Sequence, residues 1–524
     1  MPPTPEIFYS IFMLVKTYGS AVYGINATTV TVETNINPGV NFLMVGLPDS
    51  AVKESQQRIA ASLKNNGYKI PGKSIIINMA PADIRKEGSA YDLTIAVGIL
   101  AASEQILADK VSDYLIMGEL SLDGGLQPIK GVLPIAIQAR KENFKGIILP
   151  KQNAEEAGIV DGLEVYGVET IKEVIDFFNG DIELVRTIIN TEDEFFSKLK
   201  DTEFDFSDVK GQENIKRALE IAASGGHNLI LIGPPGAGKT MLAKRLPTIL
   251  PPMNLQEALE TTKIHSVAGK MGKNTGLVSI RPFRSPHHTI SDVALVGGGG
   301  VPQPGEISLS HNGVLFLDEL PEFKRTVLEV MRQPLEDRVV TISRAKFSVE
   351  YPASFMLVAS MNPCPCGYYN HPEKECVCPP GTVQKYLNKI SGPLLDRIDI
   401  HVEVTPVSYN ELSEERKSEK SESVRTRVIK ARAVQEKRYK ENNGVHCNAQ
   451  IGSKQLREVC KIDEAGNQLL KTAMEKLGLS ARAYDRILKV ARTIADLDNS
   501  ENIETNHLAE AIQYRSLDRE GWAG

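Results

Sequence analysis

The sequence lacks any long hydrophobic run. The longest apolar stretch near its start, Ile7–Val15, is interrupted by Tyr9 and Ser10, and it is too short to span a bilayer, which takes about 20 apolar residues. A basic start and a small-residue cleavage site are also missing, so a secretory signal is not predicted. We therefore expect a cytoplasmic protein without a membrane partner.

Strong charge and abundant cysteine are missing as well. The net charge is −6 over 524 residues. This argues against a protein that binds polyanions through bulk charge, so any nucleic-acid contact needs local basic patches. Four of the six cysteines fall within 15 residues. In a reducing compartment such a cluster indicates a metal site, or no site at all, rather than disulfides.

The order of strand and helix patterns predicts three folded regions, as the chain length also suggests. Strand-like runs alternate with helical patterns over residues 13–178, and the polar, acidic stretch 179–208 is expected to be a linker. A central α/β region follows over 209–406, and 448–515 is helical throughout. Between them we interpret the strongly charged residues 407–447 as a solvated helical connector, with a basic face near nucleic acid as the alternative.

A glycine-rich loop stands between a buried strand pattern and a helical pattern. It reads Gly233-Pro-Pro-Gly-Ala-Gly-Lys239-Thr240, and strand, loop and helix come in the order of a phosphate-binding P-loop. The glycines let successive N–H groups face the phosphates, and the helix N-terminus adds its positive end. Lys239 is predicted to reach the β- and γ-phosphates, and the Thr240 hydroxyl to ligate Mg²⁺. The predicted ATP-binding residues are Gly233, Pro234, Pro235, Gly236, Ala237, Gly238, Lys239, Thr240 and Met241.

Two later strand patterns end in polar residues that suit ATP hydrolysis. Four apolar residues lead into Asp318 and Glu319. Asp318 is predicted to hold Mg²⁺ with Thr240, and Glu319 to be the base that polarises the attacking water. The next strand ends at Asn362, whose amide is expected to hold the water or the γ-phosphate. The alternatives are an acidic loop after a strand and an asparagine that only forms a turn before Pro363.

These motifs lie in a wider pattern that resembles one family. Asp208-Val-Lys-Gly-Gln-Glu precedes the P-loop, and Leu394-Leu-Asp-Arg-Ile-Asp follows the strand that ends at Asn362. Together with Ser310-His-Asn-Gly-Val-Leu-Phe-Leu-Asp-Glu-Leu and Ser480-Ala-Arg-Ala-Tyr-Asp-Arg, they resemble the AAA+ ATPases of the magnesium-chelatase-like branch and, within it, the ComM/YifB group. The resemblance covers about residues 13–515, and its first motif matches the segment that runs beside the adenine.

The resemblance implies roles for single residues. Asn362 matches sensor 1, Arg397 matches an arginine finger that acts on the ATP of the neighbouring subunit, and Arg482 matches sensor 2, with Arg486 as the alternative. A finger that acts on a neighbour requires a head-to-tail ring of identical subunits, and the usual ring of the family is a hexamer. Spacing alone equally allows Arg397 to be the surface partner of a nearby aspartate.

The N-terminal region resembles the Lon-type protease fold. Lys86-Glu-Gly88 parallels the loop that carries Lon's nucleophilic serine, and the register places Ala90 at the nucleophile position. Leu133 stands where the catalytic lysine belongs. Both departures argue against a Ser–Lys dyad, so we expect a non-proteolytic domain used for assembly or for guiding substrate, with Ser89 and Lys130 as the remaining alternative.

The implied fold is α/β, with a Lon-protease-like α+β N-terminal domain, a central AAA+ P-loop α/β domain and a C-terminal helical lid domain. The family pattern begins near Met13, so residues 1–12 are expected to be a disordered extension.

The clustered cysteines form two Cys-x-Cys pairs directly after Asn362, with nine residues between the pairs. Four thiolates at this spacing can close a tetrahedral Zn²⁺ shell. We interpret 364–378 as a structural zinc loop. A shell in which His371 replaces one cysteine is an alternative, as are chance cysteines or a redox-labile pair. The predicted ligands are Cys364, Cys366, Cys376 and Cys378.

Two basic stretches, 263–310 and 338–349, are candidates for gripping a substrate. The second alternates like a β-hairpin. In this AAA+ branch the two matching insertions project towards the pore of the ring, where basic residues hold a nucleic-acid backbone. The alternative is ordinary solvated loop charge. The residues predicted to contact DNA are Arg281, Arg284, Arg344 and Lys346.

The resemblance therefore implies an ATP-driven hexameric motor that moves or branch-migrates single-stranded or branched DNA, in recombination or natural transformation. Two alternatives from other classes stay open. One is a chelatase-type ATPase that remodels a protein partner for magnesium insertion, although chelatase motor subunits are usually built without a Lon-like domain. The other is an ATP-dependent protease, which the missing dyad disfavours.

Overall fold

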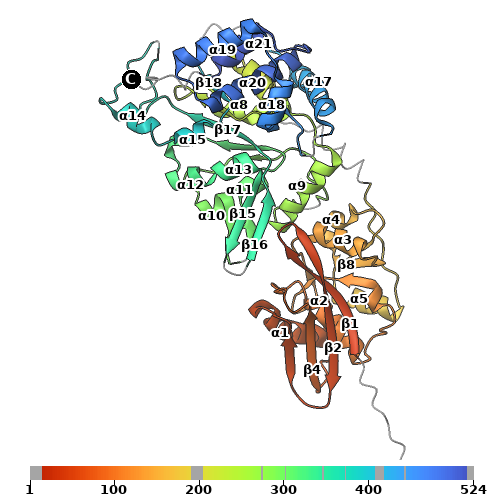
Figure 1. Ribbon diagram of the computed structural model, residues 1–524. Helices are drawn as coiled ribbons and strands as arrows, with labels where there is room; N and C mark the ends of the chain where they lie inside the picture. Colours follow the sequence, from red (N-terminus) through yellow and green to blue (C-terminus); the bar gives the residue numbers. More distant parts are fainter. Residues whose placement is uncertain are drawn as a thin grey trace, which may run out of the picture. The chain divides into compact units, whose positions relative to one another are not determined.

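The structure, a computed structural model, describes residues 14–190, 204–272, 275–300, 302–344, 347–371, 373–406, 418–441 and 444–515. The chain forms two compact units (Figure 1). The first takes residues up to 197 together with 258–278, and the second takes 198–257 together with 279 onwards. No helix in the described ranges is long and apolar enough to cross a membrane. The expected extension 1–12 lies outside these ranges.

The first unit is built on a seven-stranded mixed sheet in the order β3-β4-β2-β1-β5-β8-β9. Strand β2 pairs antiparallel with β1 and β4, and the other neighbours pair in parallel. The strands are β1 (Leu14–Tyr23), β2 (Asn26–Asn37), β3 (Phe42–Val45), β4 (Ser74–Ala80), β5 (Tyr114–Ile116), β8 (Gly146–Pro150) and β9 (Glu164–Val168), with β6 (Glu119–Leu120) and β7 (Leu126–Gln127) as a separate pair. The helices are α1 (Ser50–Asn65), α2 (Asp92–Ala102), α3 (Val132–Lys141), α4 (Ala154–Gly158) and α5 (Ile171–Asn179). This mixed α+β architecture is the one predicted.

Residues 258–278, which include most of helix α9 (Leu255–Val267), belong to the first unit although they interrupt the ATPase region of the sequence. The buried carboxylate of Glu156 accepts hydrogen bonds from the Leu133 N–H, at 2.8 Å, and from the Ser266 hydroxyl. Burial raises the pKa of Glu156. The Gly131 N–H donates to the Ser266 carbonyl at 3.1 Å. No local sequence pattern indicates this pairing, because its members are far apart along the chain.

The second unit contains a five-stranded parallel sheet in the order β11-β14-β17-β10-β18. Its strands are β10 (Leu229–Ile232), β11 (Phe283–Arg284), β14 (Val314–Leu317), β17 (Met356–Met361) and β18 (Ile400–Glu403). Every residue of β10, β14 and β17 is buried, which explains their unbroken apolar sequences. Because all five strands run the same way, the residues that follow β10, β14 and β17 meet at one edge.

Short helices and two hairpins surround this sheet. The helices are α7 (Glu213–Gly225), α8 (Lys239–Arg245), α10 (Asp292–Val296), α11 (Glu306–Leu309), α12 (Arg325–Val330), α13 (Arg332–Asp337), α14 (Thr382–Leu387) and α15 (Gly392–Leu395). The small pair is β12 (Gly297–Gly298) with β13 (Gln303–Pro304). The larger hairpin, β15 (Val339–Arg344) with β16 (Phe347–Pro352), confirms the alternation seen in the sequence.

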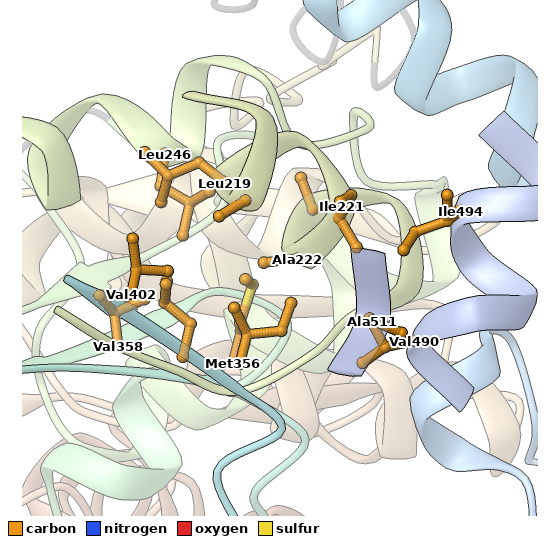
Figure 2. Packing of buried hydrophobic residues seen from close by; sticks show 14 of the residues in the cluster. Leu219, Ile221, Ala222, Leu246, Met356, Val358, Val402, Val490, Ile494 and Ala511 are labelled. Atoms are coloured by element: carbon orange, nitrogen blue, oxygen red, sulfur yellow. The ribbon is translucent and has the colours of Figure 1, made fainter. Parts of the chain in front are cut away.

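The C-terminal part of the second unit is helical, as predicted (blue in Figure 1). It contains α17 (Ser421–Tyr439), α18 (Ser453–Val459), α19 (Glu464–Leu477), α20 (Ala481–Leu497) and α21 (Thr505–Gln513). Helix α7 lies between this lid and the sheet (Figure 2). Its apolar residues belong to the same hydrophobic core as residues of the sheet and of the lid. Sheet residues in that core include Met356, Val358 and Val402; α7 adds Leu219, Ile221 and Ala222; the lid adds Val490, Ile494 and Ala511.

Two expected boundaries need correction. Helix α17 is no solvated connector, because Val424, Val428 and Tyr439 are buried in the second unit. The dense charge around them hid an apolar stripe at helical spacing. The expected end of the linker 179–208 is also wrong, because its last residues are folded into the second unit. Phe206 is almost fully buried and its N–H bonds to the Ser421 hydroxyl at 2.8 Å, so 205–208 belong to the ATPase unit.

Candidate active site

The glycine-rich loop curls around the ammonium group of its own lysine. It begins where β10 ends, and α8 begins at Lys239. Gly236 and Gly238 have φ angles of 80° and 85°, a left-handed backbone that favours glycine. The Lys239 Nζ donates to the carbonyls of Gly233, at 2.7 Å, and Pro234, at 2.9 Å. Burial lowers the pKa of Lys239, while Asp318 and Glu319 act in the opposite sense.

The tips of the three central strands bring the predicted polar residues together. Thr240 Oγ1 donates to Asp318 Oδ2 at 2.8 Å, and Lys239 Nζ donates to Asn362 Oδ1 at 3.1 Å. The Ser360 hydroxyl donates to the other oxygen of Asp318. A hydroxyl beside a carboxylate is a donor set that fits Mg²⁺, and the adjoining loop fits nucleotide phosphates. Thr240 and Asp318 would hold the ion. The sequence missed Ser360, which lies two residues before Asn362 inside an apolar strand.

Glu319 has an unusual backbone. Its φ and ψ angles are 54° and 50°, and residues held in this region cluster at functional sites. Its side chain is about half exposed, and its carboxylate lies 3.5 Å from the imidazole of His288. The sequence analysis did not predict this contact. No local pattern joins the two residues, because only the fold brings them together.

The segment ahead of α7 is fixed to the phosphate loop. Gln212 Nε2 donates to the carbonyls of Ala237 and Thr405, each at 3.1 Å. Asp208 pairs with Arg245 of α8 at 2.9 Å. The segment that the family pattern places beside the adenine therefore does lie against the P-loop.

The predicted arginine finger is held by its own chain. Arg397 follows α15, and its side chain is only 7% exposed. Its guanidinium pairs with Glu336 of α13 and donates to the Pro393 carbonyl at 2.6 Å. Arg397 lowers the pKa of Glu336 through this contact. Arg482, by contrast, is 62% exposed and lies 3.3 Å from Asp396.

Arg486, the alternative to Arg482, belongs to a buried network. It lies 2.9 Å from Asp399, which also contacts His227 at 3.0 Å, and His227 contacts Thr493 at 2.8 Å. Burial alone would raise the pKa of Asp399, but Arg486 and His227 outweigh it and hold the pKa of this carboxyl well below its usual range. Arg486 thus ties the lid to the sheet. None of the contacts described for Arg397, Arg482 or Arg486 reaches a P-loop residue.

Comparison with known proteins matches this architecture along nearly the whole chain. Residues 205–412 match the family "Magnesium chelatase, subunit ChlI", 32–153 match "Subunit ChlI of Mg-chelatase", and 418–515 match "Magnesium chelatase, subunit ChlI C-terminal". The chain is 45% identical over 500 residues to the uncharacterized protein YifB of Escherichia coli, covering 95% of this chain and 96% of YifB. It is also 45% identical over 508 residues to competence protein ComM of Haemophilus influenzae, covering 97% and 98%.

The chain belongs to the magnesium-chelatase-like ComM/YifB family. Its second unit is accordingly the α/β core and helical lid of an AAA+ ATPase. A shorter similarity, 32% identity over 128 residues, relates 24% of this chain to 23% of Lon protease 2 of Bacillus subtilis. The Lon-like fold predicted from sequence is thereby confirmed.

In the Lon-like domain of this ComM/YifB-family protein, the residues considered for a catalytic Ser–Lys dyad have different neighbours. Leu133 is fully buried in α3. The Ser89 hydroxyl donates to the carboxylate of Glu119. Lys130 lies against Gly269, since a Cβ added to that glycine would come within 2.7 Å of the lysine's Cε. Different partners thus occupy Ser89 and Lys130.

The four clustered cysteines converge. Their Sγ atoms all lie within 4.8 Å of one another, and the distances from Cys364 to Cys366 and Cys376 are 3.3 and 3.7 Å. Sulfurs about 3.8 Å apart are expected for tetrahedral Zn²⁺ with Zn–S bonds near 2.3 Å. His371 is not part of this group; its Nδ1 accepts from the Glu373 and Lys374 N–H groups at 3.1 Å.

The basic residues predicted to contact DNA have varied surroundings. Arg281 is engaged by Glu257 at 3.0 Å, and Arg284 by Glu306 at 2.6 Å. Arg344 ends strand β15 at the tip of the hairpin, and Lys346 lies outside the described residues. DNA contact by these four residues stays a prediction, and it is less favoured for Arg281 and Arg284, which already have carboxylate partners.

Proposed function

We propose that this protein is an ATP-hydrolysing ring motor that moves single-stranded or branched DNA, and that it works in the cytoplasm. The observation that carries the proposal is the separation of the catalytic groups. Lys239, Asp318 and Asn362 form one cluster, whereas Arg397 and Arg482 contact other parts of the same chain. An ATP site that needs both sets takes the second from a neighbouring subunit, and repeated head-to-tail contacts of this kind close into a ring.

The proposed hydrolysis assigns a task to each side chain. Lys239 stabilises the β- and γ-phosphates, Glu319 orients and polarises the attacking water, and Asn362 holds the water or the γ-phosphate. When bound by Thr240 and Asp318, Mg²⁺ neutralises phosphate charge. Arg397 leaves Glu336 and stabilises the charge that develops on the neighbour's γ-phosphate, with Arg482 acting on the same phosphates from the lid.

DNA is proposed as the substrate on two grounds. The relative ComM is named a competence protein, which points to natural transformation or another recombination process. Strand β15 also ends at Arg344, and Lys346 stands two positions later in the sequence. Two cations so close together in the chain suit a DNA backbone that passes through a ring.

The test compares ATP turnover with and without single-stranded and branched DNA, and measures strand displacement. We expect DNA to stimulate turnover, and Glu319→Gln to abolish both activities. Glu322→Gln is the matched control, because Glu322 pairs with Lys389 at 3.4 Å on the surface. Turnover without any DNA binding at low salt would contradict the motor and favour a chelatase-type ATPase that remodels a protein partner. ATP-dependent cleavage of a protein would instead support the protease alternative.

The hairpin is tested separately. Replacing Arg344 and Lys346 by alanine should weaken DNA binding and lower its dependence on salt by about two counterions. A chain with Lys324→Ala and Lys385→Ala loses the same charge at exposed sites elsewhere and should bind DNA as the unchanged protein does. Equal binding by all three proteins would remove the hairpin from the DNA contact.

We also propose that the four cysteines hold one structural Zn²⁺. The loop follows Asn362 directly, so a metal there would fix the end of β17 rather than act on ATP. Protein purified without added metal should contain about one zinc per chain, and Cys376→Ser should lower this content. Cys460→Ser is the control, because Cys460 is buried elsewhere. A zinc content near zero in the unchanged protein would refute the site.

A further inference from the structure

A second cavity lies at the edge of the sheet opposite the ATP site. Its volume is about 100 Å³. Gly313 and Met356, which stand at the amino-terminal ends of β14 and β17, line its floor. Its lining includes three arginines, Arg281, Arg338 and Arg432, and we call it the arginine cavity. The other polar side chains in the lining are those of Glu257, Asn312, Ser354, His446 and Gln450.

The three guanidinium groups come from different elements and are anchored in different ways. Arg281, before β11, uses all five of its N–H groups within the chain. They donate to the carbonyls of Pro251, at 2.6 Å, Pro252, at 3.4 Å, and Asn312, at 2.7 Å, and to both carboxylate oxygens of Glu257. Arg432, on α17, donates to the Ala223 carbonyl at 3.0 and 3.2 Å. Arg338 directly precedes β15, and its guanidinium donates to the Ser354 hydroxyl at 3.3 Å.

The charge of the lining is unbalanced. The carboxylate in it is Glu257, and Arg281 engages both of its oxygens, at 3.0 and 3.5 Å. Within the described parts of the chain, Arg338 and Arg432 have no ion pair. Burial lowers the pKa of Arg281 and of Arg338, and the nearby Arg432 lowers both further. Cations gathered away from water are costly unless an anion joins them.

We propose that the arginine cavity binds one small tetrahedral oxyanion, of which inorganic phosphate is the example. Arg338 and Arg432 would donate to the ion, because the N–H groups of Arg281 are already bonded within the chain. Arginine presents its N–H groups as a planar fork that matches phosphate oxygens. The volume has room for several water molecules, and therefore for a phosphate ion. This site is independent of the P-loop and of the motor activity proposed above.

A DNA backbone is the less favoured occupant. The guanidinium of Arg281 lies deep, at 16% exposure, and apolar side chains such as Leu250 and Phe355 help to enclose the space. A phosphate inside a nucleic-acid strand carries a sugar on each side, so it would approach this deep guanidinium less easily than a small free ion. A free ion meets no such obstacle.

A bound anion would join three parts of the second unit. Arg338 fixes the base of the β15–β16 hairpin, Arg432 belongs to lid helix α17, and Arg281 is tied to the loops beside the sheet. Phosphate would therefore stabilise the fold, and it would link the hairpin base to the lid.

The test measures phosphate binding by equilibrium dialysis on the full chain. Each protein carries Lys239→Ala, so that the P-loop does not compete, and ionic strength is held constant with chloride. We expect one phosphate per chain and a higher melting temperature in phosphate than in chloride. Arg338→Gln should weaken binding at least tenfold and remove the thermal shift. Lys430→Gln, which removes an exposed charge from the same helix as Arg432, should change neither.

Three results would overturn the proposal. The first is no bound phosphate in the Lys239→Ala protein. The second is unchanged binding in both Arg338→Gln and Arg432→Gln. The third is displacement of phosphate by single-stranded DNA that depends on Arg338, which would assign the cavity to a nucleic-acid backbone. Arg432→Gln also covers the case in which Arg338→Gln does not fold.

Discussion

Lys239 and Arg397 are held by different parts of the same chain. Lys239 bonds to the P-loop carbonyls and to Asn362, so its place is fixed within one chain. Arg397 is equally well held, but by Glu336 and the Pro393 carbonyl. A catalytic arginine paired with its own carboxylate is restrained until a more strongly charged group, such as a neighbour's triphosphate, competes for it.

Arg397→Ala should leave ATP binding intact and lower turnover by about 10³-fold or more, because an arginine finger acts on charge that develops during the reaction. Lys239→Ala should instead abolish binding, because it removes the ammonium that the P-loop surrounds. Fluorescent-nucleotide titration and a phosphate-release assay separate the two effects. The exposed Arg325→Ala is the control, and normal turnover in Arg397→Ala would contradict the shared site while leaving the P-loop assignment in place.

Asp399 and His227 should make the second unit less stable in acid. The pKa of Asp399 is lowered by Arg486 and His227 against the effect of burial, and burial lowers the pKa of His227. Both groups therefore bind fewer protons in the folded chain than in the unfolded one, so stability is present above their unfolded pKa values of 3.8 and 6.5 and is lost as the pH falls.

The corresponding change is Asp399→Asn. It should cost about 3 kcal/mol at pH 7, because Arg486 and His227 lose a buried partner, and it should flatten the acid limb of the stability curve. Urea unfolding between pH 7 and about pH 2.5 measures both effects, because the contribution of Asp399 is lost mainly below its unfolded pKa of 3.8. A variant with the same pH dependence as the unchanged protein would show that other groups control the acid limb.

At the scale of elements, the cysteine loop packs directly on the P-loop. Gly367 has a φ angle of 86°, and a Cβ added there would come within 2.5 Å of the Pro235 side chain. Pro363 and Gly367 also line a cavity of about 100 Å³ with Gly233 and Pro234. The loop that we propose to hold zinc is thus part of the wall behind the phosphate loop.

Gly367→Ala should therefore weaken ATP binding, because the new methyl group must push Pro235 and the left-handed backbone adds about 1 kcal/mol of strain. Gly381→Ala is a matched control, since Gly381 has a φ angle of 75° but no atom within 4 Å of the added carbon. Nucleotide titration of both variants separates the effect of the contact with Pro235 from the effect of backbone strain. Equal effects in the two variants would mean that the Pro235 contact is unimportant.

For the assembly, the proposed division of catalytic groups would make ATP turnover depend on contacts between subunits. One chain provides the P-loop cluster and, on other elements, Arg397 and Arg482. Two inactive variants can then repair each other, if one supplies an intact P-loop and the other an intact arginine.

Mixing Lys239→Ala chains with Arg397→Ala chains should restore ATP turnover. With random assembly in equal amounts, about a quarter of the sites join an intact P-loop to an intact arginine. Steady-state turnover across mixing ratios should peak near equal amounts. A mixture of Lys239→Ala chains with chains that carry both changes is the control and should stay inactive, and a first mixture that is no more active than its parts would argue against shared sites.

The P-loop motif and the fold class could be predicted from the amino-acid sequence alone. A P-loop works through contiguous backbone, so Gly233–Thr240 could be recognised without the fold, and parallel strands had to bring Asp318 and Asn362 to the same edge. Four cysteines within a short loop were also expected to lie close together, because the loop limits the distance between them. Helical spacing showed the lid, although charge concealed the apolar stripe of α17.

Only the tertiary structure decided which distant residues meet. Glu336 beside Arg397, His288 beside Glu319, and Ser266 on the buried Glu156 are contacts between elements that no local pattern connects. The same holds for Arg281, whose charge looked available in the sequence but is enclosed beside Arg338 and Arg432. Local patterns fix backbone conformation over a few residues. Burial and pairing depend on packing between segments far apart in the chain, and this packing determines the surroundings of Arg397, Glu319 and Arg281.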